Sequence, residues 1–305
     1  MATEIPFNRE FACEYGAIEE VSPLVRRVVA KNPSPFTFKG TATFIVGRGK
    51  VAVIDPGPDL AEHVAALTGA LRGESVTHIV VTHTHSDHSP AAAALKSATG
   101  ARTYGYGRHG SGRAEDRSGV GGKTEEGGDH AFVPDVALRE GDAVEGAGWR
   151  LTAVETPGHT SNHLCYALAE EQTLFTGDHV MGWSTSVITP PDGDMAAYMR
   201  SLAKLLRRQD ALYRPTHGAA IASPHPYVQA FIAHRNERTD AILARLAAGD
   251  ETIEAIVRSV YAGLDPRLVT AAGRSVLAHL VQLVEEGRAA TDGPPRLDAR
   301  YRLKA

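Results

Sequence analysis

This sequence has little cysteine and tryptophan, and charges of the two signs nearly balance. Its 305 residues include two cysteines, Cys13 and Cys165, two tryptophans, and 32 basic against 36 acidic residues, for a formal net charge of −4. Two cysteines exclude a disulfide scaffold or a four-cysteine zinc module, and we expect both to behave as small core residues. The charge balance leaves no global basic field that would attract nucleic acid.

Long apolar runs and an export signal are also missing. No stretch approaches the roughly 18 continuous apolar residues that a membrane-spanning helix needs, so we expect no membrane partner. The first residues, MATEIPFNREFACEY, lack the apolar core of a signal peptide. With so few cysteines, this predicts a cytoplasmic protein. Hydrophobic residues at 43% allow a sizeable core, and charged residues at 22% exclude a chain dominated by disorder.

Short apolar runs alternate with turns and helices through the first two-thirds of the chain. The runs predict strands at residues 43–47, 51–55, 79–82, 150–156, 164–168, 173–176 and 211–214. The spacing predicts helices from a cap at Asp59 to Gly73, over residues 89–98 and over residues 194–207. Strands with interspersed helices indicate a layered α/β architecture with helices outside.

The pattern changes to helical periodicity near residue 226. One segment places Ile253, Ile256, Val257 and Val260 on a face, and a second does the same with Leu277, Leu280, Val281 and Val284. A short strand-like tail follows at Tyr301–Leu303. We therefore expect a catalytic domain over residues 1–225 and a small, mostly helical domain over residues 226–305.

Histidine is the residue in excess, with 14 copies, and its densest cluster carries the functional argument. His83, His85, Asp87 and His88 fall within six positions after an apolar strand. A lone histidine is more often a hydrogen-bonded residue than a ligand, but four such groups together have no evident structural purpose without a metal. Alternation puts His83 and His85 on one side, while Asp87 and His88 can turn toward a second point, which predicts two neighbouring metals.

Three later strand ends supply further potential ligands. They are His159 in Pro157-Gly158-His159-Thr160, Asp178 in Gly177-Asp178, and His217 in Thr216-His217-Gly218. A glycine beside each ligand allows a tight turn and a close approach of the backbone.

The motifs HTHSDH, PGHT, GD and a His-Gly turn, in this order, resemble the metallo-β-lactamase superfamily. The resemblance implies a four-layer αββα sandwich with a binuclear site on one edge. It implies one metal held by His83, His85 and His159, a second held by Asp87, His88 and His217, and Asp178 as the bridge. Asp55 resembles an early aspartate of the superfamily, which we expect to brace the histidine loop without binding metal. Such ligands suit two Zn²⁺ ions, and iron or manganese is accommodated by similar sets.

A site of this kind predicts a hydrolase. Two ions roughly 3.5–4 Å apart lower the pKa of a shared water and supply a bridging hydroxide, so no serine or cysteine nucleophile is needed. Asp178 would position the hydroxide, and Asp87 could accept its proton as well as bind metal. We expect cleavage of a small-molecule ester, thioester or lactam.

Further stretches resemble one subgroup of the superfamily. They are residues 177–186, 190–195, 198–202 and 234–238, followed by the helical tail. This subgroup contains the mitochondrial β-lactamase-like endoribonuclease and its bacterial relatives, which carry a C-terminal winged-helix domain. The resemblance implies an alternative function, cleavage of single-stranded RNA with the same metals. A third hypothesis, a DNA-binding regulator with a metal domain as sensor, is disfavoured because a sensor does not require all seven ligands.

The sequence leaves two possible roles open for several segments. The Gly-rich residues 107–130 form a loop, and the basic residues around it make either a solvated surface or an anion-binding flap: Arg102, Arg108, Arg113, Arg117 and Lys123. In the tail, Arg267, Arg274 and Arg288 could bind nucleic acid, or the tail packs on the main domain or on a second subunit of a homodimer. Residues 184–186 either hydrogen-bond substrate or form a turn. His163 is a candidate for orienting a ligand from behind.

Overall fold

The computed structural model describes residues 4–113, 119–120 and 127–304, and two β-sheets dominate it. The first sheet has seven strands in sequential order: β1 (Ile18–Glu20), β2 (Val25–Val29), β3 (Ala42–Val46), β4 (Lys50–Ile54), β5 (Ser75–Val80), β6 (Arg102–Gly105) and β7 (Val136–Ala137). Pairing is antiparallel from β1 to β4 and parallel from β4 to β7.

The second sheet has five strands: β8 (Ala143–Gly146), β9 (Trp149–Glu155), β10 (Leu164–Leu168), β11 (Thr173–Gly177) and β12 (Leu212–Pro215). Their order is β12-β11-β10-β9-β8, and only β11 and β12 pair in parallel. The central strands β10 and β11 are buried along their whole length, as expected for a sheet covered on both faces.

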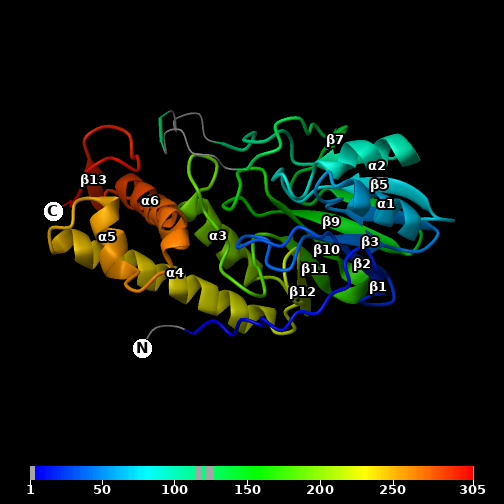
Figure 1. Ribbon diagram of the computed structural model, residues 1–305, viewed down its shortest axis with the longest axis horizontal. Coiled ribbons are helices and arrows are strands. Elements are labelled where there is room, and N and C mark those ends of the chain that lie inside the picture. Colours follow the sequence, from blue (N-terminus) through cyan, green and yellow to red (C-terminus); the bar gives the residue numbers. More distant parts are fainter. Residues whose placement is uncertain (1–3, 114–118, 121–126, 305) are drawn as a thin grey trace.

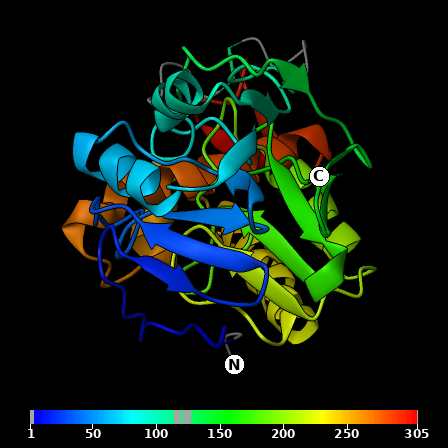
Figure 2. The ribbon, with the colours of Figure 1, turned by 90° about the vertical axis from the view of Figure 1, so that its right-hand side faces the viewer.

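Helices cover the outer face of each sheet (Figures 1 and 2). Helices α1 (Ala61–Ala70) and α2 (Ala91–Thr99) enclose one apolar core with the first sheet. Helices α3 (Met195–Leu205) and α4 (Pro224–Ala247) enclose another with the second sheet. The third core fills the space between the sheets, where the rings of Phe44 and Phe175 lie 5.1 Å apart. The predicted four-layer αββα sandwich is therefore confirmed.

The C-terminal part is a winged-helix domain, as predicted. It contains α5 (Ile253–Val260), α6 (Val269–Glu285) and a hairpin of β13 (Ala289–Thr291) and β14 (Tyr301–Leu303). Two short 3₁₀ helices lie at Ala169–Glu171 and Pro266–Leu268.

Helix α4 belongs to both parts of the molecule. Its first half packs on the sandwich through Tyr227, Val228 and Phe231, whereas Ile242 and Leu246 in its second half pack with α5 and α6. Figure 1 shows this helix running along one side of the structure toward the far end of the C-terminal part. The predicted boundary after residue 225 falls in the first turn of α4 and stays a prediction.

Local differences from the sequence-based expectations have physical causes. Asp59 does not cap α1, which follows Leu60 without a side-chain cap, whereas Asp194 caps α3 by accepting a 2.8 Å hydrogen bond from the Ala197 amide. The sequence did not predict β2 because two arginines interrupt its apolar residues. One of them, Arg26, is buried because its guanidinium pairs with Glu74 at 2.8 Å.

The structure can be compared with the expectations for the two cysteines and for membrane-spanning helices. Cys165 is buried, and Cys13 is half-buried and packs against the core between the sheets, so both behave as apolar residues. Among the described residues, no helix has the length and apolar character that crossing a membrane requires.

The buried His279 of α6 predicts a pH dependence of stability. Its Nδ1 lies 3.0 Å from Thr239 Oγ1, and burial holds the pKa of its imidazole well below the ordinary value. In the unfolded chain the imidazole binds a proton below a pH of about 6.5. The folded protein does not bind this proton, so stability is present above that pH and is lost as the pH falls.

We therefore expect His279→Leu to flatten the decline of unfolding free energy below a pH of about 6.5 by up to about 1.4 kcal/mol per pH unit. Urea unfolding from pH 8 to pH 5 measures both slopes. The prediction concerns the slope alone, so an overall loss of stability in the variant does not affect it. Parallel curves for the two proteins would contradict it.

Candidate active site

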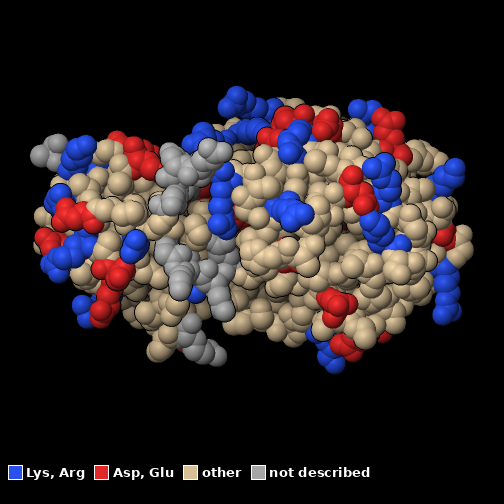
Figure 3. All heavy atoms as spheres, turned by 90° about the horizontal axis from the view of Figure 1, so that it is seen from above, with Lys and Arg blue, Asp and Glu red and all other residues tan. Residues whose placement is uncertain are grey.

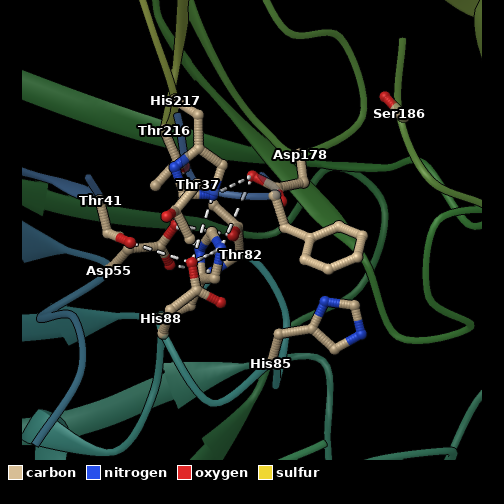
Figure 4. A network of polar contacts seen from close by, with 12 residues as sticks. Thr37, Thr41, Asp55, Thr82, His85, His88, Asp178, Ser186, Thr216 and His217 are labelled. Carbon is tan, nitrogen blue, oxygen red and sulfur yellow. Dashed lines mark hydrogen bonds and ion pairs between the residues drawn. The ribbon is translucent and has the colours of Figure 1, made fainter. Parts of the chain in front are cut away.

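The seven side chains predicted as ligands lie together at one edge of the sandwich. The loop of His83, His85, Asp87 and His88 follows β5, and the other three follow the ends of β9, β11 and β12: His159, Asp178 and His217. Figure 4 shows His88, Asp178 and His217 converging on one point, with the His85 ring below Asp178 and apart from them in this view.

The side chains form two groups that share Asp178. In the first group, His85 Nδ1 lies 3.1 Å from His83 Nε2 and 3.0 Å from His159 Nε2. In the second, Asp87 Oδ2 lies 3.2 Å from His217 Nε2 and 3.4 Å from His88 Nε2. The two groups adjoin, because donor atoms of His83, His88 and Asp178 also lie within 4.8 Å of one another.

Asp178 presents a different oxygen to each group. Its Oδ1 lies 3.3 Å from His217 Nε2 and 3.6 Å from His88 Nε2, while its Oδ2 lies 3.7 Å from His159 Nε2. A carboxylate in this position can bind two cations at once, one through each oxygen.

The chemistry of the donor atoms fits metal ions. His88 Nε2 and Asp178 Oδ1 are buried and accept or donate no hydrogen bond among the described residues. Buried polar atoms almost always have a partner, and a cation coordinated by both atoms would supply one. The set of imidazole nitrogens and carboxylate oxygens is the kind that zinc, iron and manganese use.

Backbone carbonyls orient two of the imidazoles. His159 Nδ1 donates to the Val187 carbonyl at 2.5 Å, and His217 Nδ1 donates to the Gly40 carbonyl at 3.1 Å. When these imidazoles are neutral, the bonds hold the proton on Nδ1, so that Nε2, the atom that faces the other ligands, is the one that can bind a metal.

Asp55 braces the histidine loop as predicted. Its carboxylate accepts hydrogen bonds from the amide and the hydroxyl of Thr82, both at 2.7 Å, and lies 3.0 Å from His88 Nδ1. The Thr216 hydroxyl donates to the same carboxylate at 3.3 Å. The buried carboxylate thus joins the loop after β5 to the loop after β12.

The three imidazoles of the first group are uncharged. Burial, together with neighbouring imidazoles, lowers the pKa of His83 well below its usual value and the pKa of His85 to about 3. Burial also lowers the pKa of His159. Neutral imidazoles are the form that binds a metal.

The second group is dominated by its carboxylates. Burial opposes the charged form, but the imidazoles of His88 and His217 hold the pKa values of Asp87 and Asp178 well below the usual range. Burial alone would lower the pKa of the His217 imidazole. The nearby carboxylates of Asp178 and Asp87 outweigh burial and raise this pKa to about 10. This group therefore stabilises positive charge strongly.

A cavity of about 330 Å³ opens over these side chains. Its polar floor contains Asp87, Asp178 and three of the histidines, namely His85, His159 and His217. Apolar walls come from Phe36, Met181 and Val187. Such a cavity admits a small acyl group or a comparable molecule.

Two described parts of the Gly-rich segment pair with residues at or next to the cavity lining. The Ser86 amide donates to the Gly127 carbonyl at 2.8 Å, and the Asp129 amide donates to the Thr84 carbonyl at 2.7 Å. At the other end, Arg113 Nε donates to the buried Asp192 at 2.9 Å. The end of the segment thus pairs with the histidine loop.

The hypothesis of an anion-binding flap is not supported by the described residues. Arg113 turns to Asp192, and Arg102 and Arg108 are exposed outside the cavity lining. Arg117 and Lys123 lie outside the described residues.

Hydrogen bonds describe the other residues whose roles were open. The Ser186 hydroxyl donates to the His179 carbonyl and the Ser184 hydroxyl to the Thr185 carbonyl, so both hydroxyls bond the backbone. His163 bonds Thr156 through Nδ1 at 2.8 Å, and its ring packs 5.1 Å from that of His83, so its contact with a ligand is by packing.

Three residues near the site were missed by sequence reasoning. The Thr41 hydroxyl donates to Asp87 Oδ2 at 2.9 Å, Arg235 of α4 donates to the Ser186 carbonyl next to Val187, and Arg274 of α6 lines the cavity. Only the tertiary fold brings these distant positions together, and no local pattern signals them.

Comparisons with known proteins agree with this geometry. Residues 36–217 match the Metallo-beta-lactamase superfamily, and residues 252–295 match the Beta-lactamase associated winged helix domain. The chain belongs to the metallo-β-lactamase superfamily. It is a hydrolase of that superfamily with a C-terminal winged-helix domain.

Individual relatives extend over most of the chain. The lactamase-like protein adaB of Aspergillus niger is 30% identical, over 97% of this chain and 94% of that protein. The atrochrysone carboxyl ACP thioesterase of Claviceps purpurea is 30% identical, over 80% of this chain and 74% of that protein. A metallo-beta-lactamase family protein from Thermus thermophilus superposes with a TM-score of 0.74 at 25% identity, over 93% of this chain and 100% of that one.

We expect Asp55→Asn to lower the free energy of unfolding by about 1–3 kcal/mol, because the amide cannot accept all the hydrogen bonds that the carboxylate accepts. Urea unfolding of the metal-free protein measures this change. Asp59→Asn is the matched control, since Asp59 is exposed and caps nothing, and it should change stability by no more than about 0.5 kcal/mol. An equal, small effect of both substitutions would refute the role of Asp55.

Proposed function

We propose that this superfamily member is a binuclear metal hydrolase that cleaves a small-molecule thioester. The observation that carries the proposal is the position of Asp178, whose two oxygens face two separate groups of imidazoles. In this proposal, one metal is bound by His83, His85 and His159 and the other by Asp87, His88 and His217.

Bound divalent ions supply a nucleophile from water near neutral pH and polarise the carbonyl of the substrate. The protein's own groups hold the reacting parts in place. Asp178 spans the two groups, and Asp87 lies beside it with Oδ2 fixed by the Thr41 hydroxyl. We assign Asp178 to positioning the reacting water and Asp87 to accepting its proton, because both carboxylates face the cavity.

Zinc is the metal that we favour. Five imidazole nitrogens and two carboxylates without cysteine suit Zn²⁺, and iron or manganese would use a similar set. Elemental analysis of the purified protein distinguishes the three metals.

A thioester is favoured over an ester or a lactam because a relative that covers most of this chain is named as a thioesterase. The cavity of about 330 Å³ combines a polar floor with apolar walls, which suits an acyl group. The alternative of RNA cleavage has less support, because basic and acidic residues are interspersed over the face that Figure 3 shows.

Removing one ligand tests the metal site. We expect His88→Ala to reduce the metal content from two equivalents to one or fewer. It should also reduce kcat/KM by roughly 100-fold or more, which is a larger loss than that expected for a residue that only hydrogen-bonds a ligand. Elemental analysis and a thioester assay measure the two effects. His225→Ala is the matched control, because His225 is half-buried on α4 and bonds the Arg208 carbonyl. A His88→Ala protein that keeps two equivalents and full activity would refute the binuclear site.

A substrate panel tests the reaction. With zinc-loaded protein, we expect hydrolysis of an acyl-N-acetylcysteamine thioester to be faster than that of the matching oxygen ester or of a β-lactam, and no cleavage of a labelled single-stranded RNA. Spectrophotometric release of the thiol and gel analysis of the RNA give the readouts. Cleavage of the RNA without turnover of any thioester would replace this proposal with the nuclease function.

A further inference from the structure

One arginine of α4 is buried without a carboxylate beside it. Arg235 is 4% exposed, and no aspartate or glutamate of the described residues lies within ion-pair distance of its guanidinium. Its Nη2 donates to the Ser186 carbonyl, and its Cζ lies 5.4 Å from the centre of the Tyr198 ring. Its Nε has no hydrogen-bond partner in the described part of the chain. Burying a cation without an anion is costly, so stability alone does not explain this arginine.

The carbonyl that Arg235 binds is next to a carbonyl that binds a predicted metal ligand. The Val187 carbonyl accepts the hydrogen bond from His159 Nδ1 at 2.5 Å. Because peptide groups are planar, only the φ and ψ rotations of Val187 lie between the carbonyls of residues 186 and 187. The guanidinium of Arg235 therefore holds one end of Val187, and the imidazole of His159 contacts the other.

The segment around Val187 has no regular structure to support it. Residues 185–189 form neither a helix nor a strand, so side-chain contacts determine how their backbone is placed. The Ser186 hydroxyl donates to the His179 carbonyl at 2.8 Å, and the Tyr198 hydroxyl donates to the same carbonyl at 2.9 Å. These bonds hold the side chain of Ser186, which Figure 4 shows to the right of Asp178, whereas Arg235 holds its carbonyl.

Arg235 occupies the stretch of α4 where its two halves meet. Phe231, one turn before it, packs in the sandwich, and Ile242, two turns after it, packs in the winged-helix core. The Thr239 hydroxyl donates to the Arg235 carbonyl at 3.1 Å and also lies 3.0 Å from Nδ1 of the buried His279 of α6. The C-terminal domain thus supports the part of α4 that carries this arginine.

We propose that Arg235 is a positioning residue for His159. By fixing the Ser186 carbonyl, it keeps the Val187 carbonyl directed at His159 Nδ1, so that Nε2 of the imidazole faces the first metal. The inference rests on the proposed binuclear function and adds how one of its ligands is held. Partners that orient a ligand through hydrogen bonds typically change metal affinity by about 10- to 100-fold when they are removed.

The affinity for zinc tests this role without an activity assay. Competition with a chromophoric chelator gives the dissociation constants of the two zinc ions. We expect Arg235→Met to weaken one of them by about 10- to 100-fold and to leave the other unchanged. Arg235→Lys keeps a cationic donor without the planar fork, so its loss should be smaller. Unchanged constants in Arg235→Met, or an equal loss at both sites, would overturn the proposal.

Arg238→Met is the matched control. Arg238 lies three positions farther along α4, is half-buried, donates to the Val260 carbonyl at 3.2 Å and has its Cζ 4.5 Å from the centre of the Tyr261 ring. The substitution removes the same kinds of contact, but in the winged-helix domain. Urea unfolding of the metal-free proteins records the effect of each change on stability. Only Arg235→Met should weaken zinc binding, and an equal loss of affinity in Arg238→Met would show that the effect is merely structural.

A measurement on the metal-free protein separates this inference from the proposed function. Nitrogen NMR of protein with isotope-labelled histidine locates the imidazole proton of His159, whose signal is identified by its absence in His159→Gln. We expect the proton on Nδ1 in the wild type, and divided between Nδ1 and Nε2 in Arg235→Met. If the wild type binds fewer than two zinc ions, the binuclear function is wrong, and the NMR result alone decides on Arg235. The same proton distribution in both proteins then refutes the role of the arginine.

Discussion

Two carboxylates held in a buried pocket among five imidazoles set the requirements for the rest of this structure. Burying charge is costly unless each charged atom has partners, so Asp87 and Asp178 need imidazoles, a threonine hydroxyl or cations close by. The sandwich meets this need by ending β5, β9, β11 and β12 at one edge, where each following loop contributes a donor. Asp55 then joins two of these loops beneath the pocket.

The candidate ligands could be predicted from the sequence because each depends on a local pattern. Every one lies shortly after an apolar strand, and a glycine flanks each of the three later ones, at Gly158, Gly177 and Gly218. The glycines matter sterically: a Cβ atom on Gly158 would lie 2.4 Å from Tyr198 Cα, and one on Gly177 would lie 2.6 Å from His163 Nε2. Strand ends and helix faces were likewise predictable because their determinants are neighbours in the chain.

The features that could not be predicted depend on contacts between distant residues. Arg26 and Arg27 make the sequence of β2 look polar. The burial of Arg26 is explained only by its ion pair with Glu74, which is distant in the sequence. The pairing of Arg113 with Asp192 joins residues 79 positions apart, so no local pattern could predict it. Arg274 carried no local mark that it lines the cavity, because its placement depends on how α6 docks against α3.

The continuity of α4 restricts how the molecule can vary. The helix has 24 residues, with its first half in the sandwich core and its second half in the winged-helix core. Each residue of an α-helix advances the chain by about 100° of rotation and about 1.5 Å of rise. Inserting or deleting a single residue near the middle of α4 would therefore swing the winged-helix domain around the helix axis and carry its side of the cavity away. The length of this helix therefore keeps the two parts in register.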